Sequence, residues 1–190
     1  MTTNTTGNYN TVLGYQANVG SGNLTNATAI GANAIVEASN KVVIGSAAVT
    51  SIGGYASWSN FSDRRLKENI LYQDRLGLNF INKLHTASYN YKADKSKRHR
   101  DGLIAQDVQE TLNELGLDFS GLVIDSDSAK TLNLSYSEFV LPLINSVQEL
   151  SRQNEELMKN NMEILQKNKE LENDIKEIKS LLKEKSQITK

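Results

Sequence analysis

The residues whose types and spacing could do chemistry lie in one stretch, residues 62–70. Ser62 and Lys67 are five residues apart there. A serine hydroxyl is a weak nucleophile at neutral pH and needs a base to take its proton. A lysine amine supplies that base where burial or nearby positive charge favours its neutral form, and Arg64 and Arg65 are candidate sources of such charge. Spacing alone leaves two interpretations open, a catalytic dyad or two unrelated surface residues.

Other common chemistries are excluded by the residues that the chain lacks. There is no cysteine, so disulfides and thiolate metal sites are absent. The two histidines, His85 and His99, are 14 residues apart without a carboxylate pattern around them, which argues against a metal site and a histidine-based triad. No glycine-rich phosphate loop occurs. We therefore expect neither a metal nor a cofactor.

The overall composition favours neither a nucleic acid nor a membrane as partner. The 190 residues carry a net charge of -1, so no bulk field attracts phosphates or an acidic bilayer. No apolar run approaches the roughly 20 residues that span a membrane. The polar start of the chain does not resemble a signal peptide. We expect the chain to be a fragment of a longer protein.

Residues 1–58 carry a short internal repeat. Its three units are Thr11-Val12-Leu13-Gly14-Tyr15-Gln16-Ala17, Thr28-Ala29-Ile30-Gly31-Ala32-Asn33-Ala34 and Val42-Val43-Ile44-Gly45-Ser46-Ala47-Ala48. One strand-like patch per repeat is typical of a β-solenoid, with glycine at a tight corner and small Ala and Ile side chains stacked inside. The alternative is a disordered Asn/Thr/Gly linker, against which the repeated Ile-Gly-x-x-Ala pattern argues.

Three such repeats bury little apolar surface, because each repeat needs neighbours to cover it. We therefore expect residues 1–58 to be the end of a longer solenoid shaft that is stabilised by further repeats, by partner chains, or by both. Gly53 and Gly54 end the repeats. Trp58, the single tryptophan, is expected to pack as an apolar anchor at the domain junction.

Residues 59–135 have the pattern of a small α+β domain. A short amphipathic helix is predicted over 75–84, a strand over 87–91, and a strand leading into a helix from Gly102, with Gly116 as the C-cap. Residues 122–125 and 131–134 read as a β-hairpin. The basic stretch from Lys92 to Arg100 is interpreted as a solvated loop between strands rather than as a phosphate-binding patch, since no nucleic-acid-binding fold accompanies it.

Residues 136–190 predict a long coiled-coil helix, with Ser135 or Ser137 as N-cap and Pro142 in the first turns. Apolar residues recur every seven positions at d: Leu143, Leu150, Leu157, Ile164, Leu171 and Ile178. The a positions are then Val147, Asn154, Asn161, Asn168, Ile175 and Leu182. Buried asparagines at a fix register at a cost in stability. The pattern predicts a parallel oligomer and leaves two or three strands open; a single amphipathic helix on a core is the alternative.

Three blocks of residues resemble the endosialidase-type intramolecular chaperone domain found at the C-termini of phage tail spikes and tail fibres and in related bacterial surface proteins. The first is Ser62-Asp63-x-Arg65-x-Lys67-x-Asn69-Ile70, and the second is Gly102-Leu103-Ile104-Ala105-Gln106-Asp107-Val108. The third runs from Tyr136 through Glu149-Leu150 into the heptads. The repeats likewise resemble those of trimeric adhesin heads and tail-fibre shafts.

This resemblance implies a homotrimer that cleaves itself between Phe61 and Ser62. Ser62 would be the nucleophile and Lys67 the general base of a single-turnover peptidase, with Asp63, Arg65 and Asn69 in supporting roles. The domain would help the upstream β-solenoid of the same protein to trimerise and fold, and would then be released. The implied location is a virion tail fibre or spike, or a bacterial cell surface.

Three other functions are compatible with parts of the pattern. The first is a trimerisation and attachment module that is not cleaved. The second is a receptor-binding or adhesin tip, although aromatic platforms for carbohydrate are sparse in residues 1–58. The third is a DNA-linked regulator like a self-cleaving, membrane-tethered animal member of the family, against which the absence of a DNA-binding pattern argues.

Overall fold

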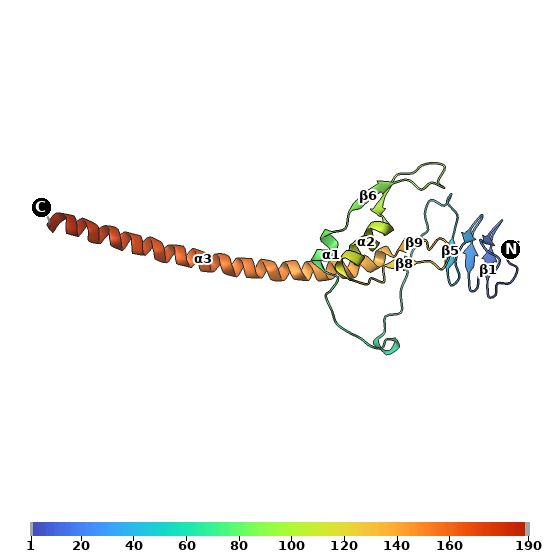
Figure 1. Cartoon of the computed structure of the whole chain (residues 1–190), viewed down its shortest axis with the longest axis horizontal. Coiled ribbons are helices and arrows are strands. Elements are labelled where there is room, and N and C mark those ends of the chain that lie inside the picture. The colour runs from blue at the N-terminus through green and yellow to red at the C-terminus, as the bar shows by residue number, and fades with distance from the viewer. Residues whose placement is uncertain (1, 189–190) are drawn as a thin grey trace.

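The computed structural model describes residues 2–188 and contains both helices and small sheets, as the sequence predicts. The repeats lie at one end of the molecule and the long helix α3 leads away from the other, with a small mixed domain between them (Figure 1). The predicted mixed α and β fold class is therefore confirmed at this level.

Successive repeats stack on one another through parallel strand pairs. Strands β1 (Thr11–Leu13), β3 (Thr28–Ile30) and β5 (Val42–Ile44) form one sheet, and β2 (Asn18–Val19) pairs with β4 (Ile35–Val36). Thr11 pairs with Thr28, and Thr28 with Val42, so the register matches the repeat in the sequence. We call residues 11–50 the repeat segment.

The inside of the repeat segment is filled by very small side chains. Ala27, Ala29, Ala34 and Val36 are fully buried. The prediction that isoleucine also stacks inside is wrong for Ile44, which is 40% exposed. Successive side chains of a strand point to opposite faces, so in β1, β3 and β5 the middle residue faces inward and the residue before the glycine faces outward.

Glycine is required where the repeats approach one another most closely. Gly14 and Gly31 have φ values of +135° and +111°, a region that L-residues with side chains rarely adopt. A Cβ atom on Gly14 would lie 2.6 Å from the backbone carbonyl of Gly31. The glycine of each repeat thus lets the next backbone stack directly on it.

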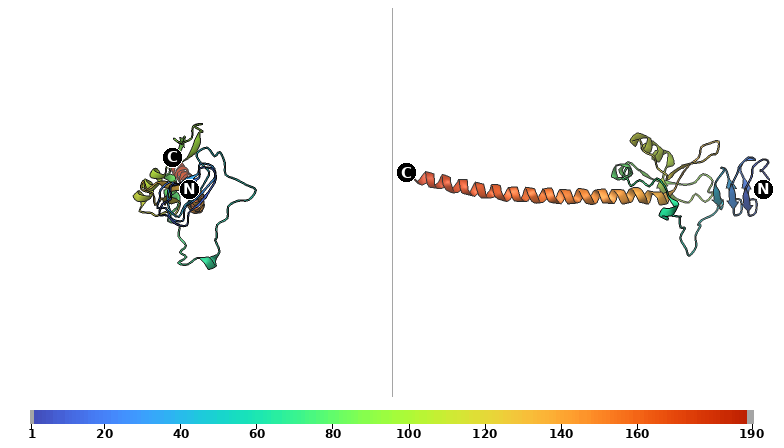
Figure 2. Two further views of the ribbon diagram at one scale, coloured as in Figure 1. Left: turned by 90° about the vertical axis from the view of Figure 1, so that its right-hand side faces the viewer. Right: turned by 90° about the horizontal axis from the view of Figure 1, so that it is seen from below.

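A long loop joins the repeat segment to the mixed domain and is exposed throughout residues 51–75. It swings away from the rest of the molecule (Figures 1 and 2). The expectation that Trp58 packs at a domain junction is wrong, because its side chain is 85% exposed. Among residues 2–188 of the single chain, no element lies over this loop to cover it.

The mixed domain is built around a cluster of phenylalanines. Its elements are α1 (Leu78–Asn82), β6 (Thr86–Tyr89), β7 (Arg100–Leu103), α2 (Ala105–Leu115), β8 (Leu122–Ile124) and β9 (Leu132–Leu134). Phe80, Phe119 and Phe139 are buried, with ring centroids 5.6 and 4.9 Å apart in edge-to-face contact. Strands β6 and β7 form one antiparallel hairpin and β8 and β9 another.

One helix cap in this domain agrees with the sequence prediction in full, and another agrees in position but not in its hydrogen bond. Gly116 caps α2 in the left-handed conformation, as predicted. Ser135 is the N-cap residue of the 3₁₀ turn that leads into α3 (Val140–Ile188), as predicted, although its side chain makes no capping hydrogen bond. The chain enters α3 through a 3₁₀ turn, η2 (Tyr136–Phe139), in which the amide of Glu138 already bonds to the carbonyl of Ser135.

Within residues 2–188, the hydrogen bonds that anchor helix α3 to the mixed domain lie near its start. The Glu149 carboxylate accepts the amide N–H of Leu78 at the beginning of α1, and Asn145 donates to the carbonyl of Leu76. Pro142 is buried in the first turn, where a missing N–H costs little. Beyond Leu150, every residue whose side chain is described is exposed.

Candidate functional site

The predicted site residues lie in the long loop, where a single 3₁₀ turn, η1 (Arg64–Leu66), interrupts extended chain. Asp63 caps this turn, since its Oδ1 atom accepts the amide N–H of Arg65 at 2.8 Å. The amide of Lys67 bonds to the carbonyl of Arg64 at 3.1 Å and closes the turn. Because a 3₁₀ helix makes one turn in about three residues, the chain on its two sides is brought close together.

The consequence of this turn is that Ser62 and Lys67 meet. The Nζ atom of Lys67 donates a hydrogen bond to the Oγ atom of Ser62 at 2.9 Å. That distance lies in the range for proton transfer between a nucleophile and its base. The structure thus places the two residues in contact.

Asp63 and Arg65 form a bidentate ion pair beside the dyad. The Nε atom of Arg65 lies 3.1 Å from both carboxylate oxygens, and one terminal nitrogen lies 2.6 Å from Oδ2. The guanidinium lowers the pKa of Asp63, and the carboxylate in turn raises the pKa of Arg65. Asp63 therefore contacts Arg65 both through the cap of the turn and through the ion pair.

The two arginines do not turn their charge toward Lys67. Arg65 is engaged by Asp63, and Arg64 donates a hydrogen bond to the hydroxyl oxygen of Tyr72 at 3.2 Å. Tyr72 is a member of the loop that the sequence reasoning missed; its place two residues after the first block carried no recognisable signal. It ties the end of the loop back to the turn.

The remaining two predicted residues do not touch the dyad through any hydrogen bond within residues 2–188. Asn69 has a φ of +53°, a left-handed conformation that asparagine tolerates, and so reverses the chain after the turn. Phe61 precedes the nucleophile, and its side chain is 94% exposed. The proposed scissile bond is therefore open to solvent in the single chain.

The described residues, 2–188, contain neither a metal-ligand cluster nor a membrane-spanning helix. Within residues 2–188, no group of three or more acidic or histidine side chains is placed to hold a metal ion. Over the same residues, no helix combines the length and the apolar character needed to cross a bilayer.

A known family resembles the middle of the chain. Residues 62–117 match a peptidase family model described as chaperone of endosialidase. The matched range begins at Ser62 and includes the first two blocks of the resemblance; the third block, from residue 136, lies outside it. No curated protein matches the chain. The match shows that residues 62–117 are similar to the endosialidase chaperone family, and the resemblance drawn from the sequence is thereby confirmed.

Proposed function

We propose that the chain is an intramolecular chaperone that assembles as a homotrimer, promotes folding of an upstream β-solenoid, and then cuts itself between Phe61 and Ser62. The parent protein would be a tail fibre, a tail spike or a bacterial surface protein. The observation that carries the proposal is the 2.9 Å contact between Lys67 Nζ and Ser62 Oγ at the first residue of the family match.

The reaction follows from the position of the hydroxyl relative to the peptide bond before it. Ser62 Oγ attacks the carbonyl carbon of Phe61 while the neutral amine of Lys67 takes the hydroxyl proton. The C–N bond breaks, and that proton passes to the departing amine of Ser62, leaving an ester between Phe61 and Ser62 Oγ. Water hydrolyses the ester to give a carboxylate at Phe61 and a free amine at Ser62.

Assembly would provide the burial of Lys67 that the single chain lacks. A lysine acts as a base only in its neutral form, which burial favours, and Lys67 is exposed in the single chain. Large apolar side chains of the same loop are also exposed: Tyr55, Trp58, Phe61, Leu66, Leu71 and Tyr72. Neighbouring copies packed against this loop would cover both Lys67 and these apolar side chains. Cleavage would then take place only after the oligomer has formed.

The long helix supports the same conclusion. Its 49 residues extend for about 70 Å, and the heptad stripe from Leu143 to Leu182 is exposed along this length. An apolar stripe with a seven-residue period is buried when parallel helices pair along it. Joined through α3, the copies hold their repeat segments at high effective concentration.

The repeat segment is the part that benefits from such help. Its parallel strands join residues 14 or 17 positions apart, and non-local pairing is slow to form. A solenoid completed on a trimeric template would remain folded after the helper is cut away, because its unfolding is kinetically blocked. The cut would thus remove the helper while the solenoid stays folded.

The rival function is a trimerisation and attachment module that stays intact. The exposed heptad stripe favours it as much as it favours the chaperone, since both need the trimer. The two functions differ only in the chemistry of Ser62 and Lys67.

The test is the mass of the refolded chain by denaturing gel and intact mass spectrometry. Self-cleavage gives fragments of 61 and 129 residues. Ser62→Ala should remain intact, and Lys67→Arg should as well, because a guanidinium stays charged and cannot act as a base. Ser59→Ala, an exposed serine in the same loop, should be cleaved like the parent. An oligomeric parent chain that stays intact would establish the rival function.

A further inference from the structure

We propose that the two hairpins of the mixed domain form a docking surface for the last repeat, and that the ion pair between Lys41 and Asp125 holds the cleaved parts together. The surface consists of the β8–β9 hairpin and the loop between β6 and β7. The last repeat is residues 39–50. The inference rests on the proposed cut, which would leave the surface and the last repeat on separate chains.

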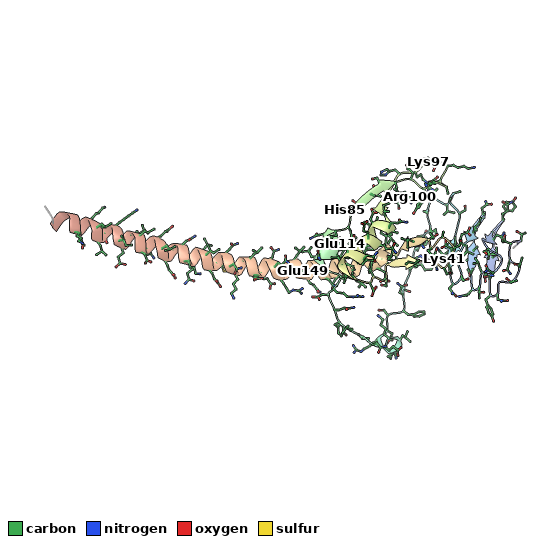
Figure 3. The ribbon with its side chains drawn as sticks, in the orientation of Figure 1. Lys41, His85, Lys97, Arg100, Glu114 and Glu149 are labelled. Atoms are coloured by element: carbon green, nitrogen blue, oxygen red, sulfur yellow. The ribbon has the colours of Figure 1, made fainter. Side chains whose placement is uncertain are left out.

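The first contact is made by the β8–β9 hairpin. Lys41 Nζ donates to the Asp125 carboxylate in an ion pair, and the Asn133 side-chain oxygen lies 3.5 Å from the same nitrogen. The Asp125 side chain is only 9% exposed and that of Lys41 is 30% exposed. Lys41 lies where the end of the hairpin meets the repeats (Figure 3). A charge pair that is mostly withdrawn from water is costly to break by removing one partner.

The hairpin turn is shaped to present this carboxylate. The amide of Asp125 bonds to the carbonyl of Thr131 at 2.9 Å, and the Asp127 carboxylate accepts both the amide and the hydroxyl of Thr131. These hydrogen bonds from Thr131 lower the pKa of Asp127, and the charge of Lys41 contributes to the same effect. Lys41 therefore sits in the field of two carboxylates on one turn.

The second contact comes from the basic loop, which the sequence had predicted to be solvated. Arg98 is half-buried; it pairs with the buried Asp94 and donates to the carbonyl of Val49 at 3.3 Å. Asp94 is fixed in turn by the amide and hydroxyl of Ser96. Arg98 is thus held in place to cap a backbone carbonyl at the end of the last repeat.

Apolar packing across this boundary is incomplete. A cleft of about 590 Å³ separates the basic loop from the last repeat and is lined by Val49, Ala47, Tyr91 and Ala93 among others. The covalent connection between the two parts is the exposed loop of residues 51–75. Once that loop is cut, charged and polar contacts hold the parts together, and these weaken as salt screens them.

The experiment uses the full chain with Ser62→Ala and a specific protease site inserted between Gly53 and Gly54, where a Cβ would meet no atom within 4 Å. After cutting, the dissociation rate of the N-terminal fragment is measured at low salt and in 1 M NaCl. The parent fragments should remain associated at low salt and separate at high salt. Asp125→Asn should speed dissociation at low salt by at least about tenfold.

Two further variants keep the result interpretable. The charge swap Lys41→Glu with Asp125→Lys should restore the parent rate, which excludes simple misfolding. Asp118→Asn removes an exposed carboxylate of the same domain that makes no hydrogen bond or ion pair with the repeats within residues 2–188, and should dissociate like the parent. Equal rates for the parent and Asp125→Asn would overturn the inference.

This design separates the inference from the proposed function. The added protease makes the cut, so the docking surface is tested whether or not the chain cleaves itself. Failure of self-cleavage would leave the fragment measurement intact. Rapid dissociation of the parent fragments at low salt would overturn the docking surface and leave the dyad untouched.

Discussion

In the repeat segment the smallest side chains are the most buried, whereas in α3 the largest apolar side chains are exposed. Ala27, Ala29 and Ala34 have no solvent contact, while Leu157 of the heptad stripe is 59% exposed. The repeats obtain their register from backbone hydrogen bonds between successive turns of one chain. The helix leaves its stripe exposed in the single chain, and in the proposed trimer it would bury the stripe against other chains. Under the proposed function, one region is therefore ordered by its own backbone and the other by contact with its copies.

This difference assigns separate tasks to the two ends of the molecule. Alanine burial provides little free energy per residue, because the buried area is small. A heptad stripe buries many leucines and isoleucines at once and forms from local helical structure. In the proposed function, the helix would bring chains together early, and the repeats would form a persistent structure once the chains are aligned.

The largest expected effect is on assembly. Leu150→Asp together with Leu157→Asp places charges at two successive d positions and should give a monomer, because two charged layers cannot be buried in a coiled-coil core. Sedimentation velocity measures the change, and the monomer should also remain uncleaved. Lys159→Asp with Gln166→Asp, on the opposite face of the helix, should leave the oligomer intact. A double d-site variant that still assembles would refute the role of the stripe.

The second effect tests the mixed domain, which has a core of its own between the two regions. Phe80 is buried and packs edge-to-face on Phe119. Phe80→Ala should lower the free energy of unfolding by about 3–5 kcal/mol, because the cavity cannot fully collapse. Urea unfolding followed by circular dichroism measures it. Tyr72→Ala, at an exposed aromatic, should change the midpoint little; equal losses in both variants would contradict this account of the core.

The third effect tests the backbone stacking of the repeats. Gly14→Ala puts a Cβ 2.6 Å from the Gly31 carbonyl carbon at a φ of +135°, so it should cost about 1–3 kcal/mol. Thermal unfolding of the repeats reports the loss. Gly53→Ala, with nothing within 4 Å of the added atom, is the matched control and should be neutral. An unchanged Gly14→Ala variant would show that the repeats do not stack as described.

Much of the fold could be predicted because it depends on short-range patterns. The 17- and 14-residue spacing of the repeats gave the strand register, and the seven-residue spacing gave the long helix. Gly116 marked the end of α2. In each case the residues that determine the structure are neighbours in the sequence or are repeated at a constant interval.

The parts that could not be predicted depend on single contacts without such a pattern. Lys41 and Asp125 are 84 residues apart and carry no shared motif. The sequence predicted that Arg98 is a solvated charge, whereas the structure places the Asp94 carboxylate beside it. At the candidate site, a spacing of five residues did not show that the Asp63-capped turn would bring Lys67 onto Ser62. The resemblance to a family pointed to Ser62 and Lys67 as a pair, which their spacing alone did not.

The smallest effect concerns the basic loop, where one carboxylate orders the contact to the repeats. Hydrogen bonds from Ser96, with the ion pair to Arg98, lower the pKa of Asp94 from 3.8 to about 2. A depressed carboxyl pKa stabilises the folded loop fully above pH 4, and this contribution is lost as the pH falls toward 2. The amide resonance of Ser96, followed by NMR, should therefore titrate with a midpoint near 2.

In Asp94→Asn the Ser96 transition should disappear, since the amide side chain does not ionise. Far-UV circular dichroism over the same pH range shows whether the helices persist while the loop loosens. A midpoint at the ordinary value of 3.8 would mean that Asp94 does not hold Arg98 in solution. The contact between Arg98 and Val49 would then lose its support, and the docking surface would rest on Lys41 and Asp125 alone.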